Sequence, residues 1–182
     1  MMLLFDEAKA TQAAARLLTL RGGTMSYVKL IKLLYLADRE ALIRWGRPIT
    51  TDRYVSLDNG PVVSRMYDLI RNEPPPNSFR IWRRFISDPE DYEVRLLGDP
   101  GSGELSRSER ELIDEVFAQH GHQSRWTVVD YTRSLPEWTN PDGGALPIET
   151  RDILRAAHKT EDEIAAMEES LESAALLERI LV

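Results

Sequence analysis

The segment between Ser26 and Gly46 constrains the fold more than any other part of the chain. Its apolar residues recur at intervals of three or four, which predicts one buried helical stripe: Leu30, Leu33, Leu34, Ala37 and Ala41. Charged residues such as Lys29 and Lys32 fall off that stripe and are expected to face away from it. Ser26 can cap the helix, and Gly46 followed by Pro48 ends it. The segment therefore predicts a long amphipathic helix.

Three other segments show the same helical signals. The first runs from Asp6 to about Leu20 and is rich in good helix formers. In the second, Ser106 and Glu109 have the spacing of a capping box, and Gly121 supplies the stop. A short helix is expected from about residue 126 to 133. The predicted core consists of Leu30, Leu34, Ala37, Val63, Met66, Ile70, Leu112, Val116 and Phe117.

Two segments carry turn or strand signals. Residues 52–57 form a short extended pattern, and Asp58-Asn59-Gly60-Pro61 makes a turn in which the proline is expected to begin a third helix. That helix should end at residues 74–76, which are three prolines. Between residues 79 and 97, apolar and polar side chains alternate on either side of residues 88–91, which predicts a β-hairpin.

Glycine and proline between residues 140 and 147 indicate a linker. We therefore divide the chain into a compact domain, residues 1–140, and a linker with a C-terminal helical extension, residues 141–182. Thr160 and Glu163 form a capping box for an amphipathic last helix, which could dock in a partner's groove or pack back on the core. The predicted fold class is α+β, predominantly helical, with one small β-hairpin and this amphipathic extension.

Composition narrows the class of protein. The 182 residues contain no cysteine, so neither a disulfide framework nor a thiolate metal site can form. The N-terminus lacks the basic lead of a signal peptide, and no apolar stretch approaches the roughly 20 residues that span a bilayer. We expect a soluble, cytoplasmic protein that does not engage a membrane.

The sequence offers little for catalysis. Its three histidines, His120, His122 and His158, lack the spacing of a zinc site, and His120 and His122 are expected to interact with the end of a helix. There is no phosphate-binding glycine loop and no glycine-flanked nucleophilic serine. We expect a protein that is not an enzyme and that uses neither a cofactor nor a metal.

Arginines in the predicted hairpin raise the question of nucleic acid. Arg80, Arg83 and Arg84 surround Trp82, and a hairpin carrying them could act as a wing against a phosphate backbone. Charged residues also guard solvated strand edges, and the net charge of −7 disfavours broad attraction to nucleic acid. Protein is therefore the favoured partner, and nucleic acid the less favoured one.

Two ordered motifs carry a resemblance to a known family. Residues 29–38 read KLIKLLYLAD, and residues 59–63, about twenty positions later, read NGPVV. With the Gly46-Arg47-Pro48-Ile49 stretch, Tyr67, and the segment from Tyr131 to Trp138, they resemble the Panacea domain of SocA-like and phage-associated GepA-like antitoxins over about residues 5 to 140. Family members commonly have histidine where this chain has Arg133.

The resemblance implies the antitoxin of a toxin–antitoxin system, with a role in bacterial phage defence. Such a protein would neutralise a cognate toxin, encoded next to it, by direct protein binding. Two alternatives stay open: a DNA-binding regulator of its own operon that uses the hairpin as a wing, and an adaptor that delivers the toxin to a protease. Self-association into a homo-oligomer also stays open.

We expect the partner to bind near the predicted turn, where aromatic side chains could anchor an interface. The candidate partner-binding residues are Trp45, Asp58, Asn59, Gly60, Pro61, Arg65, Tyr67 and Trp138. For Gly60 and Pro61, a purely structural role at the entry of a helix is an equal alternative.

Overall fold

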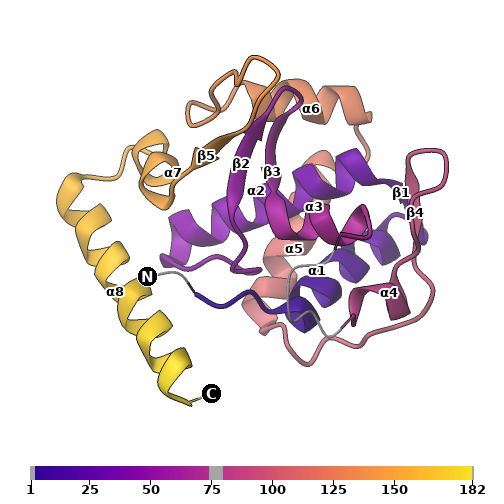
Figure 1. The fold of residues 1–182 in the computed structure, drawn as a ribbon, viewed down its shortest axis with the longest axis horizontal. Coiled ribbons are helices and arrows are strands. Elements are labelled where there is room, and N and C mark those ends of the chain that lie inside the picture. The colour runs from indigo at the N-terminus through magenta and orange to yellow at the C-terminus, as the bar shows by residue number, and fades with distance from the viewer. Residues whose placement is uncertain (1–2, 74–79, 182) are drawn as a thin grey trace.

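The computed structural model describes residues 3–73 and 80–181, and Figure 1 shows their arrangement. The helices are α1 (Glu7–Leu20), α2 (Tyr27–Trp45), α3 (Ser64–Ile70), α4 (Trp82–Phe85), α5 (Arg107–His120), α6 (Arg125–Arg133), α7 (Thr150–Ala156) and α8 (Glu161–Leu181). The strands are β1 (Thr24–Ser26), β2 (Tyr54–Leu57), β3 (Gly60–Val63), β4 (Glu93–Arg95) and β5 (Leu146–Ile148). The predicted α+β class with mostly helical content is confirmed.

Helix α2 is the centre of the structure. It contacts α1, α5, α6, α7 and β3, and the β2–β3 hairpin lies across it (Figure 1). Because neighbours cover it on all sides, α2 buries charged residues together with its apolar stripe. The prediction that Lys29 and Lys32 face away from the buried side is therefore wrong: both are buried. All nine predicted core residues are buried.

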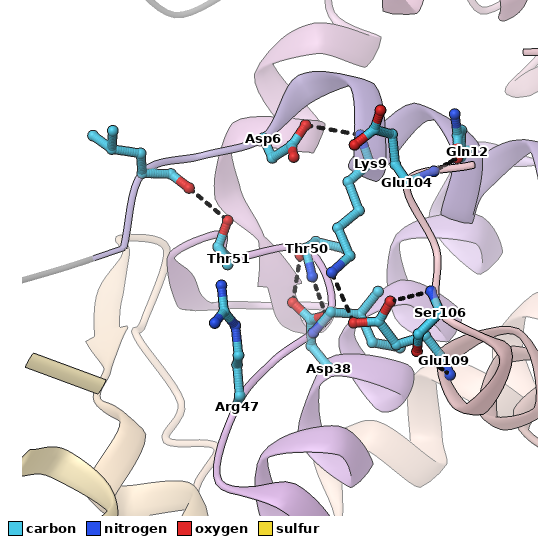
Figure 2. Close-up of polar contacts among 12 residues, drawn as sticks. Asp6, Lys9, Gln12, Asp38, Arg47, Thr50, Thr51, Glu104, Ser106 and Glu109 are labelled. Atoms are coloured by element: carbon cyan, nitrogen blue, oxygen red, sulfur yellow. Dashed lines mark hydrogen bonds and ion pairs between the residues drawn. The ribbon is translucent and has the colours of Figure 1, made fainter. Parts of the chain in front are cut away.

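The buried carboxylate of Asp38 holds the chain that follows α2. Its Oδ1 accepts hydrogen bonds from the backbone N–H groups of Ile49 at 3.0 Å and Thr50 at 2.9 Å. Its Oδ2 accepts from the Thr50 hydroxyl and, at 3.1 Å, from the Tyr54 hydroxyl. Figure 2 shows Asp38 with Thr50. Burial raises the pKa of Asp38 to about 6, and these four donors oppose that rise.

Other polar residues of α2 bind other segments. Lys29 Nζ donates to the backbone carbonyls of Gly121 and Gln123, which join α5 to α6. Tyr35 donates to Glu137 Oε1 at 2.8 Å, and Arg39 pairs with the same carboxylate at 2.6 Å. Lys29, Tyr35 and Asp38 of the KLIKLLYLAD run thus join α2 to distant parts of the chain.

The strands form two small sheets. β2 lies between β3 and β5 and pairs antiparallel with both, whereas β1 pairs antiparallel with β4. Pro61 and Pro147 stand in β3 and β5, the two edge strands of the larger sheet. Proline lacks an N–H to donate, and an edge strand has one side on which no donor is needed. β5 begins inside the segment predicted as a linker, and the domain division at residue 140 stays a prediction.

One predicted element is wrong and another is only partly formed. Pro61 does not begin a helix, because residues Gly60–Val63 pair with β2 and α3 starts at Ser64. The arms of the hairpin predicted for residues 79–97 do meet, through antiparallel bridges of Ile86 with Leu96 and of Glu90 with Glu93, but the first arm begins with the helix α4, and β4 of the second arm pairs with β1. Residue 79 itself lies outside the described residues. Trp82 is buried and its backbone N–H donates to Glu7 Oε1 at 3.0 Å, so a tertiary contact with α1 outweighs the local alternation.

Helix α8 begins at its predicted capping box and packs back on the core as far as Ala175. Ile164 is buried, and the Met167 side chain lies against Gly46 at the end of α2. Arg47 pairs with Glu178 at 3.0 Å. The last turns expose Leu176, Leu177, Ile180 and Leu181. In Figure 1 this end of α8 extends away from the rest of the chain.

The N-terminal segment is fixed to the core by polar contacts. Figure 2 shows Asp6 accepting the backbone N–H of Lys9 at the start of α1, and the Thr51 hydroxyl donating to the Leu4 carbonyl. Lys9 reaches across to Glu109 of α5 at 2.7 Å. In the described part of the chain, no helix combines the length and the apolar character that crossing a membrane requires.

Candidate functional site

A cavity of about 300 Å³ opens between the start of α2, the β2–β3 turn, α3 and the loop that follows α6. Its apolar wall comes from Val28, Ile31, Leu57 and Val62. Its polar lining comes from Tyr27, Lys32, Asp58, Asn59, Tyr67, Gly143 and Gly144. We call this space the Lys32 cavity. Residues from these four segments meet here, so the cavity exists only in the folded chain.

Lys32 is the charged group at the base of this cavity. Its side chain is 1% exposed, and its Nζ donates one hydrogen bond, to the Pro61 carbonyl at 2.8 Å. An ammonium has three donors. No carboxylate of residues 3–73 or 80–181 pairs with it, and burial lowers its pKa to about 7. The structure thus holds an amine that is half protonated near neutral pH beside an open space.

The β2–β3 turn forms the rim of the cavity. Asp58 and Asn59 are exposed at its tip, and Asp58 Oδ1 accepts the backbone N–H of Gly143 at 3.0 Å. Gly60 follows with φ +99, and a Cβ at that position would lie 2.8 Å from Thr132 Oγ1 and 3.2 Å from Lys32 Nζ. The turn needs glycine both for its backbone angle and for its close approach to α6 and Lys32.

An exposed aromatic group lies beside the cavity. Tyr27, which lines the cavity, stacks on Tyr92 at 6.3 Å between ring centroids. The Arg125 guanidinium lies 5.8 Å from the Tyr92 ring and 4.9 Å from the Trp126 ring. Tyr92 is 64% exposed and Trp126 is 56% exposed. We call Tyr92, Arg125 and Trp126 the aromatic ledge.

The structure distributes the predicted partner-binding residues over more than one place. Asp58, Asn59 and Tyr67 line the Lys32 cavity. Gly60 and Pro61 are buried in β3 beside it. Their roles as partner contacts stay predictions.

Three predicted residues stand apart from the cavity lining. Trp138 is half-buried, its Nε1 donates to the Leu57 carbonyl at 2.9 Å, and Arg133 lies 4.9 Å over its ring. Trp138 therefore stabilises the β2–β3 turn through the end of β2. Arg65 lies over the Phe5 ring at 5.6 Å. Trp45 is 45% exposed at the opposite end of α2 from the cavity.

Lys32 and the aromatic ledge escaped the sequence analysis. Lys32 falls off the apolar stripe of its helix, so it was expected to face away from the core. A second signal was available, since a helix covered on all sides must bury its charges as well. Tyr92, Arg125 and Trp126 come from segments more than thirty residues apart, and no local pattern joins them.

The histidines lie outside the lining of the Lys32 cavity. Within residues 3–73 and 80–181, no set of three or more histidine, aspartate or glutamate side chains is placed to hold a metal ion. His120 contacts Gln123 and the Tyr131 ring, and His122 lies against Phe117. The Lys32 cavity therefore combines a buried amine and an apolar wall, and exposed aromatic rings lie beside it.

Comparison with known proteins gives one finding. The family model described as antitoxin SocA-like, Panacea domain, matches residues 30–139, more than half of the chain. The match includes Lys32, the β2–β3 turn and the aromatic ledge. No curated protein and no solved structure matches the chain.

Proposed function

The chain belongs to the SocA-like antitoxin family with a Panacea domain, and we propose that it neutralises a cognate toxin by binding the toxin protein directly. The proposal assigns no catalytic step to the chain. We expect the toxin to be encoded by a neighbouring gene and the complex to form in the cytoplasm.

The face that carries both the Lys32 cavity and the aromatic ledge supports direct binding. Tyr, Trp and Arg dominate the residues on which protein interfaces depend, and here all three are neighbours on one exposed surface. The Lys32 cavity beside them can accommodate a side chain of the partner. This combination is the observation on which the proposal rests.

The DNA-binding alternative has less support than direct binding of a protein. Arg83 and Arg84 are exposed, but they lie on the four-residue helix α4 and not on a strand of a hairpin wing, and Trp82 is buried. The fate of the toxin distinguishes a proteolytic adaptor from a blocking antitoxin. An adaptor shortens the toxin's lifetime in the cell, whereas a blocking antitoxin leaves a stable complex.

The test is co-expression of the full chain with the protein encoded beside it, with bacterial growth and co-purification as readouts. We expect growth to be rescued and a complex to be recovered. Trp126→Ala and Tyr92→Ala should weaken the complex at least tenfold. Trp45→Ala is the matched control, because it removes an exposed tryptophan from the other end of α2. If Trp45→Ala abolishes the complex and Trp126→Ala does not, the partner binds the other end.

A neighbour that is harmless alone, or is toxic and not rescued, contradicts the proposal for that pair. Toxin that is rescued but disappears faster with the chain present than without it would replace blocking with delivery to a protease. Equal toxin levels with restored growth support direct neutralisation.

A further inference from the structure

Lys32 is a buried cation whose hydrogen-bonding capacity is incompletely used. Its neighbour Lys29, one turn earlier on the same helix, donates to two backbone carbonyls. Lys32 donates to one, the Pro61 carbonyl, and lines a cavity. Burying a charge without an opposite charge is costly, so such a site favours any ligand that supplies one.

The surroundings of Lys32 specify the charge and size of that ligand. The ionisable groups that line the cavity with it are Asp58, Tyr27 and Tyr67, and Arg133 of α6 packs against Gly60 nearby. Asp58 is at the rim and already accepts the backbone N–H of Gly143. Among the described residues that line the cavity, Lys32 is the single cation. A phosphate dianion would bring more charge than one ammonium offsets, whereas a carboxylate brings one.

The walls specify what is attached to the charge. Val28, Ile31, Leu57 and Val62 line the cavity with aliphatic surface, which suits the methylene groups of an acidic side chain. About 300 Å³ is room for such a group, since one water occupies roughly 30 Å³ in the liquid. The aromatic ledge adjoins the mouth through Tyr27, so a protein that covers the ledge also covers the cavity.

We propose that the Lys32 cavity is a receptor for a carboxylate group, which the bound toxin inserts as an acidic side chain. The inference about the toxin as source rests on the proposed function. The carboxylate site itself does not, because a free small carboxylate would use the same chemistry. The experiment therefore has two arms.

The first arm tests the chemistry with simple probes. The full chain, labelled with ¹³C at lysine Cε, is titrated with acid and base in acetate, in glutarate and in chloride at equal ionic strength. The resonance absent from Lys32→Met identifies Lys32. Its titration midpoint should rise by about one pH unit in carboxylate relative to chloride, because a bound anion favours the ammonium. The titration midpoint of Lys29 should be the same in carboxylate and in chloride. Equal Lys32 midpoints in all three salts overturn the carboxylate site.

The second arm tests the source. The dissociation constant of the toxin is measured for the wild type, for Lys32→Met and for the control Lys159→Met, which removes a lysine between α7 and α8, with circular dichroism to confirm folding. We expect binding at least tenfold weaker for Lys32→Met at pH 6.5 and near wild-type binding for Lys159→Met. Wild-type binding should weaken between pH 6.5 and 8.5, as Lys32 loses its proton, and this dependence should be absent from Lys32→Met.

The outcomes separate the two proposals. Toxin that binds the wild type and Lys32→Met equally shows that the toxin does not insert the carboxylate, while direct neutralisation stands. If the carboxylates nevertheless shift Lys32, the ligand is a free small carboxylate. Toxin that fails to bind the wild type contradicts the proposed function, and the probe titration still decides whether the carboxylate site exists.

Discussion

Asp38 and Lys32 lie six residues apart on the same helix, and both are almost completely buried, yet the protein treats their charges differently. Both oxygens of Asp38 are occupied, with four donors from three residues around them. Lys32 has one acceptor and an adjoining cavity. The Asp38 charge therefore stabilises the fold, whereas the Lys32 charge is available to a ligand in the cavity.

The energetic consequence differs in the same way. The donors around Asp38 bond to its carboxylate, so removing the carboxylate leaves them without an acceptor in the interior. Removing the Lys32 amine leaves one carbonyl without its donor but relieves the chain of an unpaired charge. Stability should therefore depend strongly on Asp38, whereas ligand binding should depend on Lys32.

The largest expected effect comes from Asp38→Ala. The N–H groups of Ile49 and Thr50 and the hydroxyl of Tyr54 lose their acceptor together, and the free energy of unfolding should fall by about 3 to 5 kcal/mol. Urea denaturation followed by circular dichroism measures it. Asp130→Ala, which removes an exposed aspartate from α6, is the control and should stay within about 0.5 kcal/mol of the wild type. A loss below about 1 kcal/mol for Asp38→Ala would break the comparison.

The second effect is the pH dependence of stability that Lys32 creates. The pKa of Lys32 is about 7 in the folded chain because burial disfavours the ammonium, against about 10.4 for an unfolded lysine. Between pH 7 and 10 the unfolded chain holds a proton that the folded chain has released, so stability rises with pH. Relative to Lys32→Met, the wild type should gain about 3 kcal/mol in unfolding free energy over that range.

Denaturation of both proteins at pH 7, 8, 9 and 10 tests this expectation. Groups other than Lys32 titrate in both chains and cancel in the difference. A wild-type curve parallel to that of Lys32→Met at every pH would mean that the amine titrates like a solvated lysine.

Gly60→Ala should have the third largest effect, about 2 kcal/mol of destabilisation. Two comparisons divide that loss into its causes. Gly22 has a similar φ of +95 but open space around it, so Gly22→Ala reports backbone strain alone. Gly103 has neither a positive φ nor a close neighbour, and Gly103→Ala should be nearly neutral. If Gly60→Ala costs no more than Gly22→Ala, the close approach to Thr132 and Lys32 contributes nothing.

The sequence predicted local features well and long-range ones poorly, for a physical reason. Caps and stops such as Ser106, Gly46 and Gly121 act within one helical turn, so they can be recognised locally, and the apolar stripes identified the core. The acceptors of Lys29 and Lys32 come from Gly121 and Pro61, 92 and 29 residues away. The spacing of apolar residues along the helix therefore cannot reveal that these two lysines are buried.

At the β2–β3 turn, the preference of proline for a helix start competed with its tolerance in an edge strand. Proline after a turn is well suited to the first position of a helix, which predicted a helix from Pro61. The proline is equally acceptable in an edge strand, and Gly60–Val63 has β2 on one side and no strand on the other among the described residues. Pairing with β2 decided the outcome, and it placed Asp58 and Asn59 at the rim of the cavity instead of at a helix start.

The smallest expected effect is the most selective test of how Asp38 is held. Tyr54→Phe removes one of its four donors and leaves the buried ring in place, so the free energy of unfolding should fall by about 1 kcal/mol at pH 7. The hydroxyl favours the ionised carboxylate, and the pKa of Asp38 in the folded chain is about 6. Its contribution is therefore present above pH 6 and should weaken as the pH falls to 5 and Asp38 becomes protonated. Tyr131→Phe, on an exposed ring of α6, should show neither the loss nor its pH dependence. A Tyr54→Phe effect that is the same at pH 5 and pH 7 would assign the loss to packing of the ring, and Asp38 would then be held by the Ile49 and Thr50 donors without help from the tyrosine.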